Sequence, residues 1–361
     1  MNVLQQQLFG DGVHDDTLTI QRMLDKRGLI TLPHGTYLIS KPLVIHSDTH
    51  LKLAKTTVLR LADGANCSLL DNDGLYSDQY NQNITIEGGI WDGNNFNQVR
   101  QAIPNEGVGG DENEDKPCEK DVYLSNVYLI LMMRFVHVKN LVIKDLTYKD
   151  PTTFAVQIAD VEKFTVQNIT LDYNLQKPNM DGIHVQGPAS CGLIRNIIGN
   201  ANDDHVALCA NGTMRSAITH GAIQHVTVDG VYCDNGYTGV RLLSRGDPVK
   251  DVTVKNVHGA FKHFAVSFTH HYPLRDDLPV TIENVHVQNV FAQKSKRANL
   301  PSANQPPAPI IWVEGGVNVK NVVIENVYLT KGKAENVAAV VVEETAKTEN
   351  LIVKDVFVSE K

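Results

Sequence analysis

Three aspartates in two short segments are the residues of this chain whose types and spacing best suit chemistry. The segment NMDGIHV, residues 179–185, contains Asp181, and NDDHVAL, residues 202–208, contains Asp203 and Asp204. Carboxyl groups that come together in a fold repel one another, which raises some of their pKa values. An inverting glycosidase needs such a set, because one carboxylic acid protonates the leaving oxygen while carboxylates across a gap of ~6.5–9.5 Å activate water. A calcium site is the competing use, since oxygen ligands suit that ion.

A degenerate repeat, apolar-x-apolar-x-(Asn/Asp/Gly)-apolar, runs through most of the chain. It reads ITIEGGI from Ile84, FTVQNIT from Phe164 and VTVKNVH from Val252. Alternation with period two marks strands, and the Asn, Asp or Gly that follows tolerates a left-handed bend. Strand, bend and strand, repeated, predict the coils of an all-β solenoid. The bend asparagines are expected to form one stacked ladder of turn residues rather than a sugar-binding row: Asn168, Asn196, Asn256, Asn284 and Asn326.

A second series of strands predicts the register of the coils. Its apolar-x-apolar triplets are Val156-Gln157-Ile158, Ile183-His184-Val185, Val206-Ala207-Leu208, Val240-Arg241-Leu242, Val266-Ser267-Phe268 and Ile311-Trp312-Val313. The outer residues of each triplet face inward and the middle one faces outward. Because stacked coils lie ~4.8 Å apart, the middle residues should form one column on an exposed face. Asp181 and Asp204 each lie two residues before a triplet, so they are predicted to stack, with Asp203 beside them.

The chain is expected to be a single parallel β-helix domain over residues 1–361, because no Pro/Gly/Ser linker or shift in composition divides it. We expect an N-terminal cap at about residues 8–40 and coils over about 41–358. Asp15 or Asp16 can cap a short helix that turns Ile20, Met23 and Leu24 to one side and ends at Gly28. After Val358 the sequence predicts no equivalent plug, so loops, the chain folding back or another subunit should cover the last coil.

Charge and hydropathy restrict the partners. The formal charge of −8 comes from scattered acids, which argues against nucleic acid as a partner. No stretch approaches the ~18 apolar residues of a membrane span, so no membrane partner is expected. The first residues, MNVLQQQLFGDG, lack the basic and apolar regions of a secretion signal. A cytoplasmic location is therefore expected unless the chain is trimmed or is carried on a virion.

At the aspartates the sequence resembles glycoside hydrolase family 28, the polygalacturonases and their relatives. NMDGIHV is similar to the N-T-D-G segment of the family, and NDDHVAL to its (G/Q)-D-D-C-(V/I)-A segment. NITIEGGIWDGNNFN, from Asn83, resembles G-G-x-I-D-G-x-G, and FGDGVHDDTLTIQ resembles the N-terminal cap of the pectate-lyase-like superfamily. The resemblance implies a single-stranded right-handed parallel β-helix with a short N-terminal capping helix. It also implies a hydrolase without cofactor or metal, in which Asp203 is the general acid and Asp181 and Asp204 activate the water.

Downstream of the aspartates the sequence departs from the family. Tyr237-Thr238-Gly239 stands where Gly-His-Gly belongs, and Ser267-Phe268-Thr269 stands where Arg-Ile-Lys belongs. In the family that cationic pair grips the galacturonate carboxylate, so plain polygalacturonate is not the expected substrate. Arg241 lies in the outward column one coil before Ser267, a shift of ~4.8 Å, and is expected to compensate in part.

The residues expected to bind substrate are Asn179, His184, His205, Tyr237, Thr238, Arg241 and Trp312. Several have an ordinary structural alternative, such as an arginine on a solenoid surface or a tryptophan covered by a loop. The acidic loop from Gly107 to Asp121 is expected either to wall off one end of the groove, which favours attack on chain ends, or to be a solvated loop.

The first functional hypothesis is an inverting glycoside hydrolase that acts on an oligo- or polysaccharide, either pectin-related or another acidic or neutral glycan. The second is a phage- or virion-type tailspike that binds or depolymerises glycan, for which a homo-oligomer, a trimer, is expected. The third is a polysaccharide lyase or epimerase, which calcium dependence or an unsaturated product would reveal.

Overall fold

The computed structural model describes residues 7–101, 119–211, 218–270, 274–296, 308–332 and 336–360. The predicted acidic loop from Gly107 to Asp121 lies outside the described residues except for its last three. The helices in the described part are α1 (Thr17–Leu24), α2 (Gly74–Ser77) and α3 (Lys120–Ser125), with a 3-10 turn at Asn95–Asn97. None of these helices is long and apolar enough to cross a membrane.

The N-terminal strands are short and make the first coils: β1 (Asp11–Asp15), β2 (Gly28–Leu32), β3 (Thr36–Ile39), β4 (Leu43–Ile45), β5 (Thr49–Leu53), β6 (Val58–Leu61), β7 (Leu70–Asn72), β8 (Asn81–Glu87) and β9 (Ile90–Asp92). The later strands are β10 (Met133–Lys149), β11 (Val156–Asp172), β12 (Ile183–Gly199), β13 (Asp204–Cys209), β14 (Ile223–Gly236), β15 (Thr238–Leu243), β16 (Val249–Phe261), β17 (Val266–Thr269), β18 (Thr281–Lys294), β19 (Ile311–Val313), β20 (Asn318–Thr330), β21 (Val340–Val342) and β22 (Lys347–Ser359).

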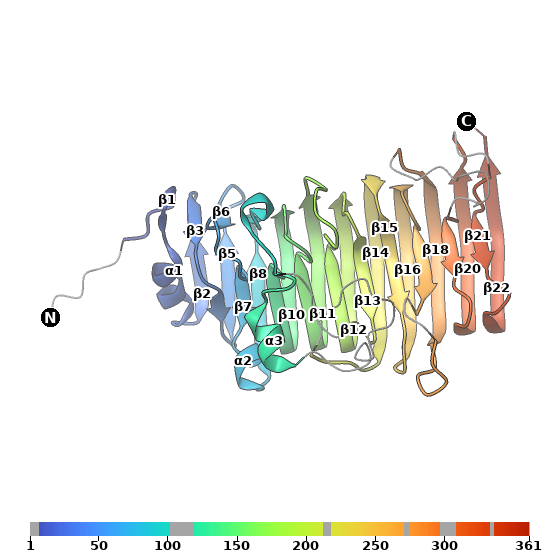
Figure 1. The fold of residues 1–361 in the computed structure, drawn as a ribbon, viewed down its shortest axis with the longest axis horizontal. Coiled ribbons are helices and arrows are strands. Elements are labelled where there is room, and N and C mark those ends of the chain that lie inside the picture. The colour runs from blue at the N-terminus through green and yellow to red at the C-terminus, as the bar shows by residue number, and fades with distance from the viewer. Residues whose placement is uncertain are drawn as a thin grey trace.

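These strands stack in parallel into one right-handed β-helix (Figure 1). Each coil pairs with the next, as β11 does with β12 and β12 with both β13 and β14. The predicted register of the triplets is confirmed, because their middle residues pair in order: Gln157, His184, Ala207, Arg241, Ser267 and Trp312. The same column continues upstream through Arg134 and Asp71.

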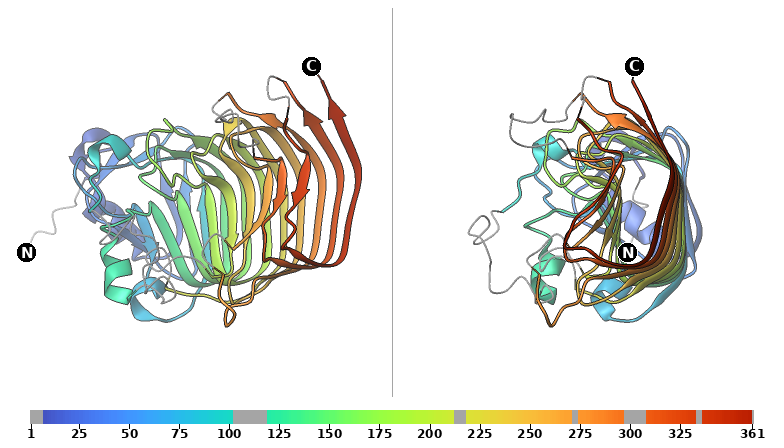
Figure 2. Two further views of the ribbon diagram at one scale, coloured as in Figure 1. Left: turned by 45° about the vertical axis from the view of Figure 1, so that its right-hand side comes forward. Right: turned by 90° about the vertical axis from the view of Figure 1, so that its right-hand side faces the viewer.

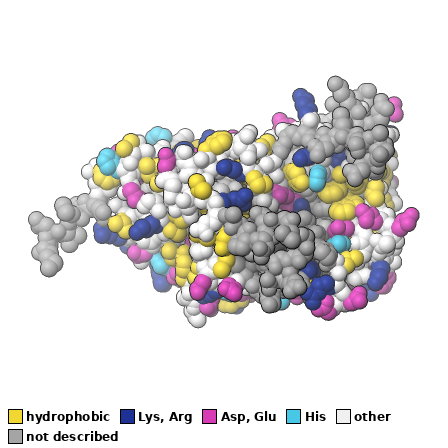
Figure 3. Space-filling model, viewed as in Figure 1, with side chains coloured by type: hydrophobic (Ala, Val, Ile, Leu, Met, Phe, Trp, Pro, Cys, Tyr) yellow, Lys and Arg dark blue, Asp and Glu magenta, His cyan; other side chains and the backbone are white. Residues whose placement is uncertain are grey.

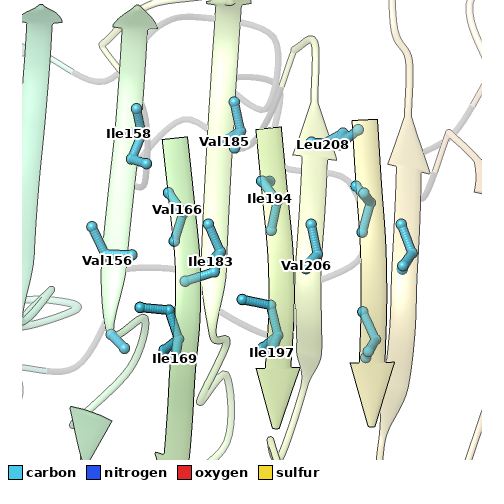
Figure 4. Close-up of a cluster of buried hydrophobic side chains, with 14 of the residues drawn as sticks. Val156, Ile158, Val166, Ile169, Ile183, Val185, Ile194, Ile197, Val206 and Leu208 are labelled. Carbon is cyan, nitrogen blue, oxygen red and sulfur yellow. The ribbon is translucent and has the colours of Figure 1, made fainter. Parts of the chain in front are cut away.

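The core is a stack of aligned aliphatic rows. Val156, Ile183 and Val206 follow one another in one row, and Figure 4 shows them opposite the rows of Val166 and Ile194. All five side chains are fully buried. One cluster of buried residues extends from Ile20 to Ala339, so the alternating pattern of the sequence produces a continuous core along the helix axis.

The bend asparagines form two ladders instead of the single ladder predicted. In the first, Asn196 donates to Asn168 at 3.0 Å, and Asn326 donates to Asn289 at 3.2 Å. Asn284 belongs to the second ladder, where it donates to Asp251 at 2.9 Å. The prediction misplaced Asn284 because each long strand bends twice with similar sequences, and its unit was aligned to the wrong bend. All these asparagines have positive φ, which their short polar side chains tolerate.

The two ends of the stack differ. Ile20 and Leu24 of α1 are fully buried in the core, and Figure 2 shows α1 within the outline of the coils. The helix ends at Leu24, before the predicted Gly28. Asp16 is its N-cap residue, but the Asp16 carboxylate accepts hydrogen bonds from the backbone of Phe9 and Gly10, and it is the Asp15 carboxylate that accepts one from the backbone N–H of Thr17, the first helical residue, at 2.9 Å. At the other end, the core-facing side chain of Val353 in β22 is 40% exposed, whereas its neighbour in register, Ile324, is 0% exposed.

The outward column is more buried than the exposed face that was predicted. Gln157 and Ala207 are fully buried, and His184 is 6% exposed; Tyr123 of α3 covers Gln157. Elsewhere the described surface mixes polar with exposed apolar side chains, and Figure 3 shows side chains of both charges scattered among hydrophobic ones over one face.

Two isoleucines of β12 test the assignment of inward and outward positions. Ile194→Ala should lower the free energy of unfolding by about 2–5 kcal/mol, because the side chain is fully buried and its removal leaves a cavity. Ile198→Ala, four residues along the same strand, removes a side chain that is 51% exposed. It should change the free energy of unfolding by no more than about 0.5 kcal/mol. Urea unfolding of both variants measures the difference, and equal losses would show that the inward and outward faces are wrongly assigned.

Candidate active site

The three aspartates lie at or just before the starts of β12 and β13, two neighbouring strands that carry residues of the outward column. Asp181 comes two residues before Ile183, Asp204 begins β13, and Gly182 donates its backbone N–H to the carbonyl of Asp204 at 2.8 Å. Asp204 pairs in turn with Thr238, the first residue of β15. The parallel register therefore stacks Asp181, Asp204 and Thr238 on successive coils, with Asp203 next to the second of them.

Arg241, whose side chain is 16% exposed, and the buried His184 contact these carboxylates. Arg241 Nε lies 2.6 Å from Asp204 Oδ2, and Arg241 Nη2 lies 3.6 Å from Asp203 Oδ1. His184 Nδ1 lies 3.1 Å from Asp181 Oδ2. Arg241 and His184 both come from the outward column, so the same register that stacks the acids also brings cationic partners to them.

Three buried oxygens of this group have no hydrogen-bond partner among the described residues: Asp181 Oδ1, Asp204 Oδ1 and Thr238 Oγ1. A buried acceptor without a partner costs about 1–3 kcal/mol, so proteins rarely leave one without a use. The three oxygens lie in one row on successive coils, so hydrogen bonds from a water molecule or a sugar hydroxyl would satisfy them.

The electrostatics differ between the aspartates. Burial raises the pKa of Asp181 well above its usual value, and the charge of Asp204 raises it further. Burial likewise raises the pKa of Asp203 well above its usual value, with repulsion from Asp181 and Asp204. A carboxyl group in this state keeps its proton at a pH where an exposed aspartate has lost it, so Asp203 can act as a proton donor.

His184 is fixed from two sides. Its ring stacks on Phe154, with centroids 4.2 Å apart and planes 10° apart. Burial alone would lower the pKa of His184, but the Cys209 thiol and the charge of Asp204 outweigh it and raise the pKa. The ring is therefore held flat over Phe154 and favours the protonated form, which suits its contact with Asp181.

The register also explains Phe154, which the sequence analysis missed. Phe154 comes two residues before Val156, in the same position on its coil as Asp181, and Phe264 comes two residues before Val266, in the position of Thr238. The acids are thus flanked by an aromatic ring on each side of the row. The triplet alignment contained this signal, because the position before each triplet can be read in every coil.

The other predicted site residues lie in different places. His205 differs from the prediction, because its ring is fully buried with Nδ1 2.7 Å from the Thr238 carbonyl and Nε2 3.1 Å from the Gly199 carbonyl. It turns into the wall because outward and inward positions alternate, and its neighbour Asp204 takes the outward one. Asn179 is exposed in the connection between β11 and β12, with φ of 58°.

Tyr237 and Trp312 lie on the downstream side of the acids. Tyr237 packs against His263 with ring centroids 4.3 Å apart, and Trp312 stacks on Phe264 at 4.8 Å. The indole Nε1 of Trp312 donates to Glu343 at 2.9 Å. Both rings are half-buried, so an aromatic wall lines this side of the site.

In the described part of the chain, no group of three or more His, Cys, Asp and Glu side chains is arranged to hold a metal ion. Asp204 instead faces the guanidinium of Arg241, and Asp181 faces the ring of His184.

A known protein family matches the part of the chain that carries these residues. The profile of "Glycosyl hydrolases family 28" matches residues 105–361, which include all three aspartates. The chain belongs to glycosyl hydrolase family 28. Residues 1–120 match a second profile, "Rhamnogalacturonase A/epimerase, pectate lyase-like".

Relatives of this family 28 chain are distant. It is 23% identical to a polygalacturonase from Medicago sativa over 274 residues, which cover 72% of this chain and 58% of that one. It is 30% identical over 190 residues to plasmin and fibronectin-binding protein A from Streptococcus pneumoniae, covering 48% and 24%. The chain therefore spans less than two-thirds of the length of these relatives. An endo-xylogalacturonan hydrolase from Aspergillus tubingensis shares the fold, with a TM-score of 0.62 at 15% identity and coverage of 98% and 94%.

Asp203→Asn should stabilise this family 28 fold at high pH. A carboxyl whose pKa is raised in the folded protein is protonated there while the unfolded chain is ionised, so its contribution to stability is favourable at low pH and is lost as the pH rises through the raised value. Asparagine removes that charge. We expect the free energy of unfolding to rise at pH 8 and to rise by less at pH 4.

Thermal unfolding of both proteins at the two pH values measures this effect. Asp172→Asn is the matched control, because its side chain is 65% exposed. A variant that is less stable than the wild type at pH 8 would contradict the raised pKa of Asp203.

Proposed function

We propose that the protein hydrolyses O-glycosidic bonds of a pectin-related polysaccharide with inversion at the anomeric carbon. The observation that carries the proposal is the row of acids on successive coils: Asp181 and Asp204 each have one oxygen without a hydrogen-bond partner in the described part of the chain, and Asp203, whose pKa is raised, lies beside them. Membership of a glycosyl hydrolase family supports the same reading.

Each acid then has a separate role. Asp203 gives its proton to the leaving oxygen as the glycosidic C–O bond breaks. A water molecule held by the free oxygens of Asp181 and Asp204 attacks the anomeric carbon from the opposite face, and Asp204 takes the proton that this water loses. The guanidinium of Arg241, 2.6 Å from Asp204, stabilises the negative charge of this base.

The sugar that follows the site on the downstream side is expected to be uncharged. Ser267 and Thr269 stand where the family carries its cationic pair, and they are 2% and 3% exposed. The Thr269 hydroxyl donates to the Glu314 carboxylate, so an acid lies where the family grips a carboxylate. Arg241 is already engaged by Asp203 and Asp204. A galacturonate carboxylate placed there would meet the acid Glu314, which would not repel a neutral pectic sugar.

A protein that binds glycan or a host protein without cleavage is the second candidate. The relative named plasmin and fibronectin-binding protein A, 30% identical over 190 residues, favours it. A binding protein has no need for the unpaired carboxylate oxygens of Asp181 and Asp204, and their cost to stability favours the hydrolase.

Hydrolysis should depend on both adjacent acids. Asp203→Asn and Asp204→Asn should each abolish the release of new reducing ends from polygalacturonate, xylogalacturonan, rhamnogalacturonan or other plant and bacterial polysaccharides, because one removes the proton donor and the other the base. Asp172→Asn, an exposed surface change, should keep full activity and shows that the loss is specific. Unchanged circular dichroism and a single cooperative unfolding transition establish that the fold is intact.

Full activity in either active-site variant would rule out these roles. Binding of a polysaccharide without any product would favour the second candidate, and an unsaturated product that absorbs in the ultraviolet would indicate a lyase instead.

A further inference from the structure

We propose that the active site is closed on its upstream side and therefore cleaves sugar chains from an end instead of in the interior. This inference rests on the proposed function, since it concerns how a polysaccharide reaches the three aspartates. It is carried by the described residues of the outward column upstream of His184 and by helix α3.

The column that should form the floor of an open groove is covered upstream of the acids. In register, the outward residues before His184 are Gln157, Arg134 and Asp71. Their exposed fractions are 0%, 1% and 0%. Polar side chains that point away from the core of a β-helix are normally wet, so their complete burial means that other parts of the chain occupy the space where a sugar chain would continue.

Tyr123 of α3 is the main covering group. Its hydroxyl donates to the Gln157 side chain, and its backbone carbonyl accepts a hydrogen bond from Arg134 Nη1 at 2.5 Å. Figure 2 shows α3 outside the outline of the coils, against the side that carries this column, and Figure 1 places it beside α2 and β10. The helix is thus bonded to two consecutive positions of the floor.

The cover is anchored firmly. Arg134 makes a two-point contact with Asp71, from Nε at 2.9 Å and from Nη2 at 2.7 Å, and both residues are buried. A second apolar cluster packs around Tyr123 and includes Leu75, Leu131 and Phe154. A fixed two-point ion pair together with apolar packing makes this a wall of the fold rather than a surface loop lying over the groove.

The wall stands close to the chemistry. Gln157 pairs with His184, so the covered position is one coil, ~4.8 Å, from the histidine that contacts Asp181. Phe154, which belongs to the apolar cluster of the wall, stacks directly on His184. A polysaccharide can therefore place only a chain end between the acids and the wall.

The downstream side is less covered. Ala207 and Ser267 of the outward column are 0% and 2% exposed here too, but the side chain of Arg241 is 16% exposed, and Tyr237 and Trp312 are half-buried, whereas no upstream residue of the column from Gln157 to Asp71 is more than 1% exposed. The remainder of a bound chain is expected to leave the site on this side, along the coils that carry these residues.

The pattern of products from polymers tests the inference. Wild-type protein is incubated with polygalacturonate, xylogalacturonan and rhamnogalacturonan, and the viscosity, the number of reducing ends and the product sizes are followed together. For the polymer that is cleaved, we expect short products from the first time points and a slow fall in viscosity per bond broken. Interior cleavage, seen as long products and an early collapse of viscosity, would overturn the inference while the proposed function stands. Cleavage of none of the polymers would instead overturn the proposed function, and this inference with it.

Two variants link the product pattern to the wall. Tyr123→Ala removes the ring that covers Gln157 and should shift the products toward longer chains. Tyr123→Phe keeps the ring and removes only the hydroxyl contact, so it should retain the wild-type products and remains informative if the alanine variant does not fold. Tyr328→Ala is the matched control, because Tyr328 is 37% exposed and lies far downstream on β20, and it should leave the products unchanged. A folded Tyr123→Ala variant with the wild-type pattern would contradict the role of α3.

Discussion

The parallel hydrogen-bond register between β12, β13 and β15 is the constraint on which the site depends. Once Ile183 lies beside Val206 and Val206 beside Val240, the residues two positions earlier must also stack. The backbone register alone then places Asp181, Asp204 and Thr238 on successive coils. The fully buried aliphatic rows fix that register, because a slip of one residue would turn every core side chain outward.

A few polar contacts offset the unfavourable energy of bringing these carboxyl groups together. Three carboxyl groups at the wall of a solenoid are costly unless they are paired or protonated. Arg241 lies within 4 Å of two of them, and burial keeps the pKa of the third, Asp181, and of Asp203 high. The same contacts that make the cluster tolerable give it one proton donor and one charged base. Stability and chemistry are therefore in opposition at this place.

Much of the site could be predicted from the sequence, because a solenoid converts sequence position into spatial position almost directly. The six triplets aligned correctly, and with them the stacking of Asp181 and Asp204 and the nearness of Arg241 and His184. What failed depended on contacts between distant segments or on choices between similar bends. The cover of Gln157 comes from α3, which precedes it by more than thirty residues and shows no repeat. His205 was expected in the site, although the alternation that places Asp204 outward also turns it inward.

The central claim is that Asp181, Asp203 and Asp204 act together on one bond with a water molecule between the first and the last. The anomeric configuration of the sugar end released in the first minutes of hydrolysis tests this most directly, and proton NMR can follow it before the anomers equilibrate. We predict the configuration opposite to that of the bond cleaved, because water attacks directly from the other face. Release of the same configuration would contradict it, since retention requires one of the aspartates to form a covalent bond to the sugar.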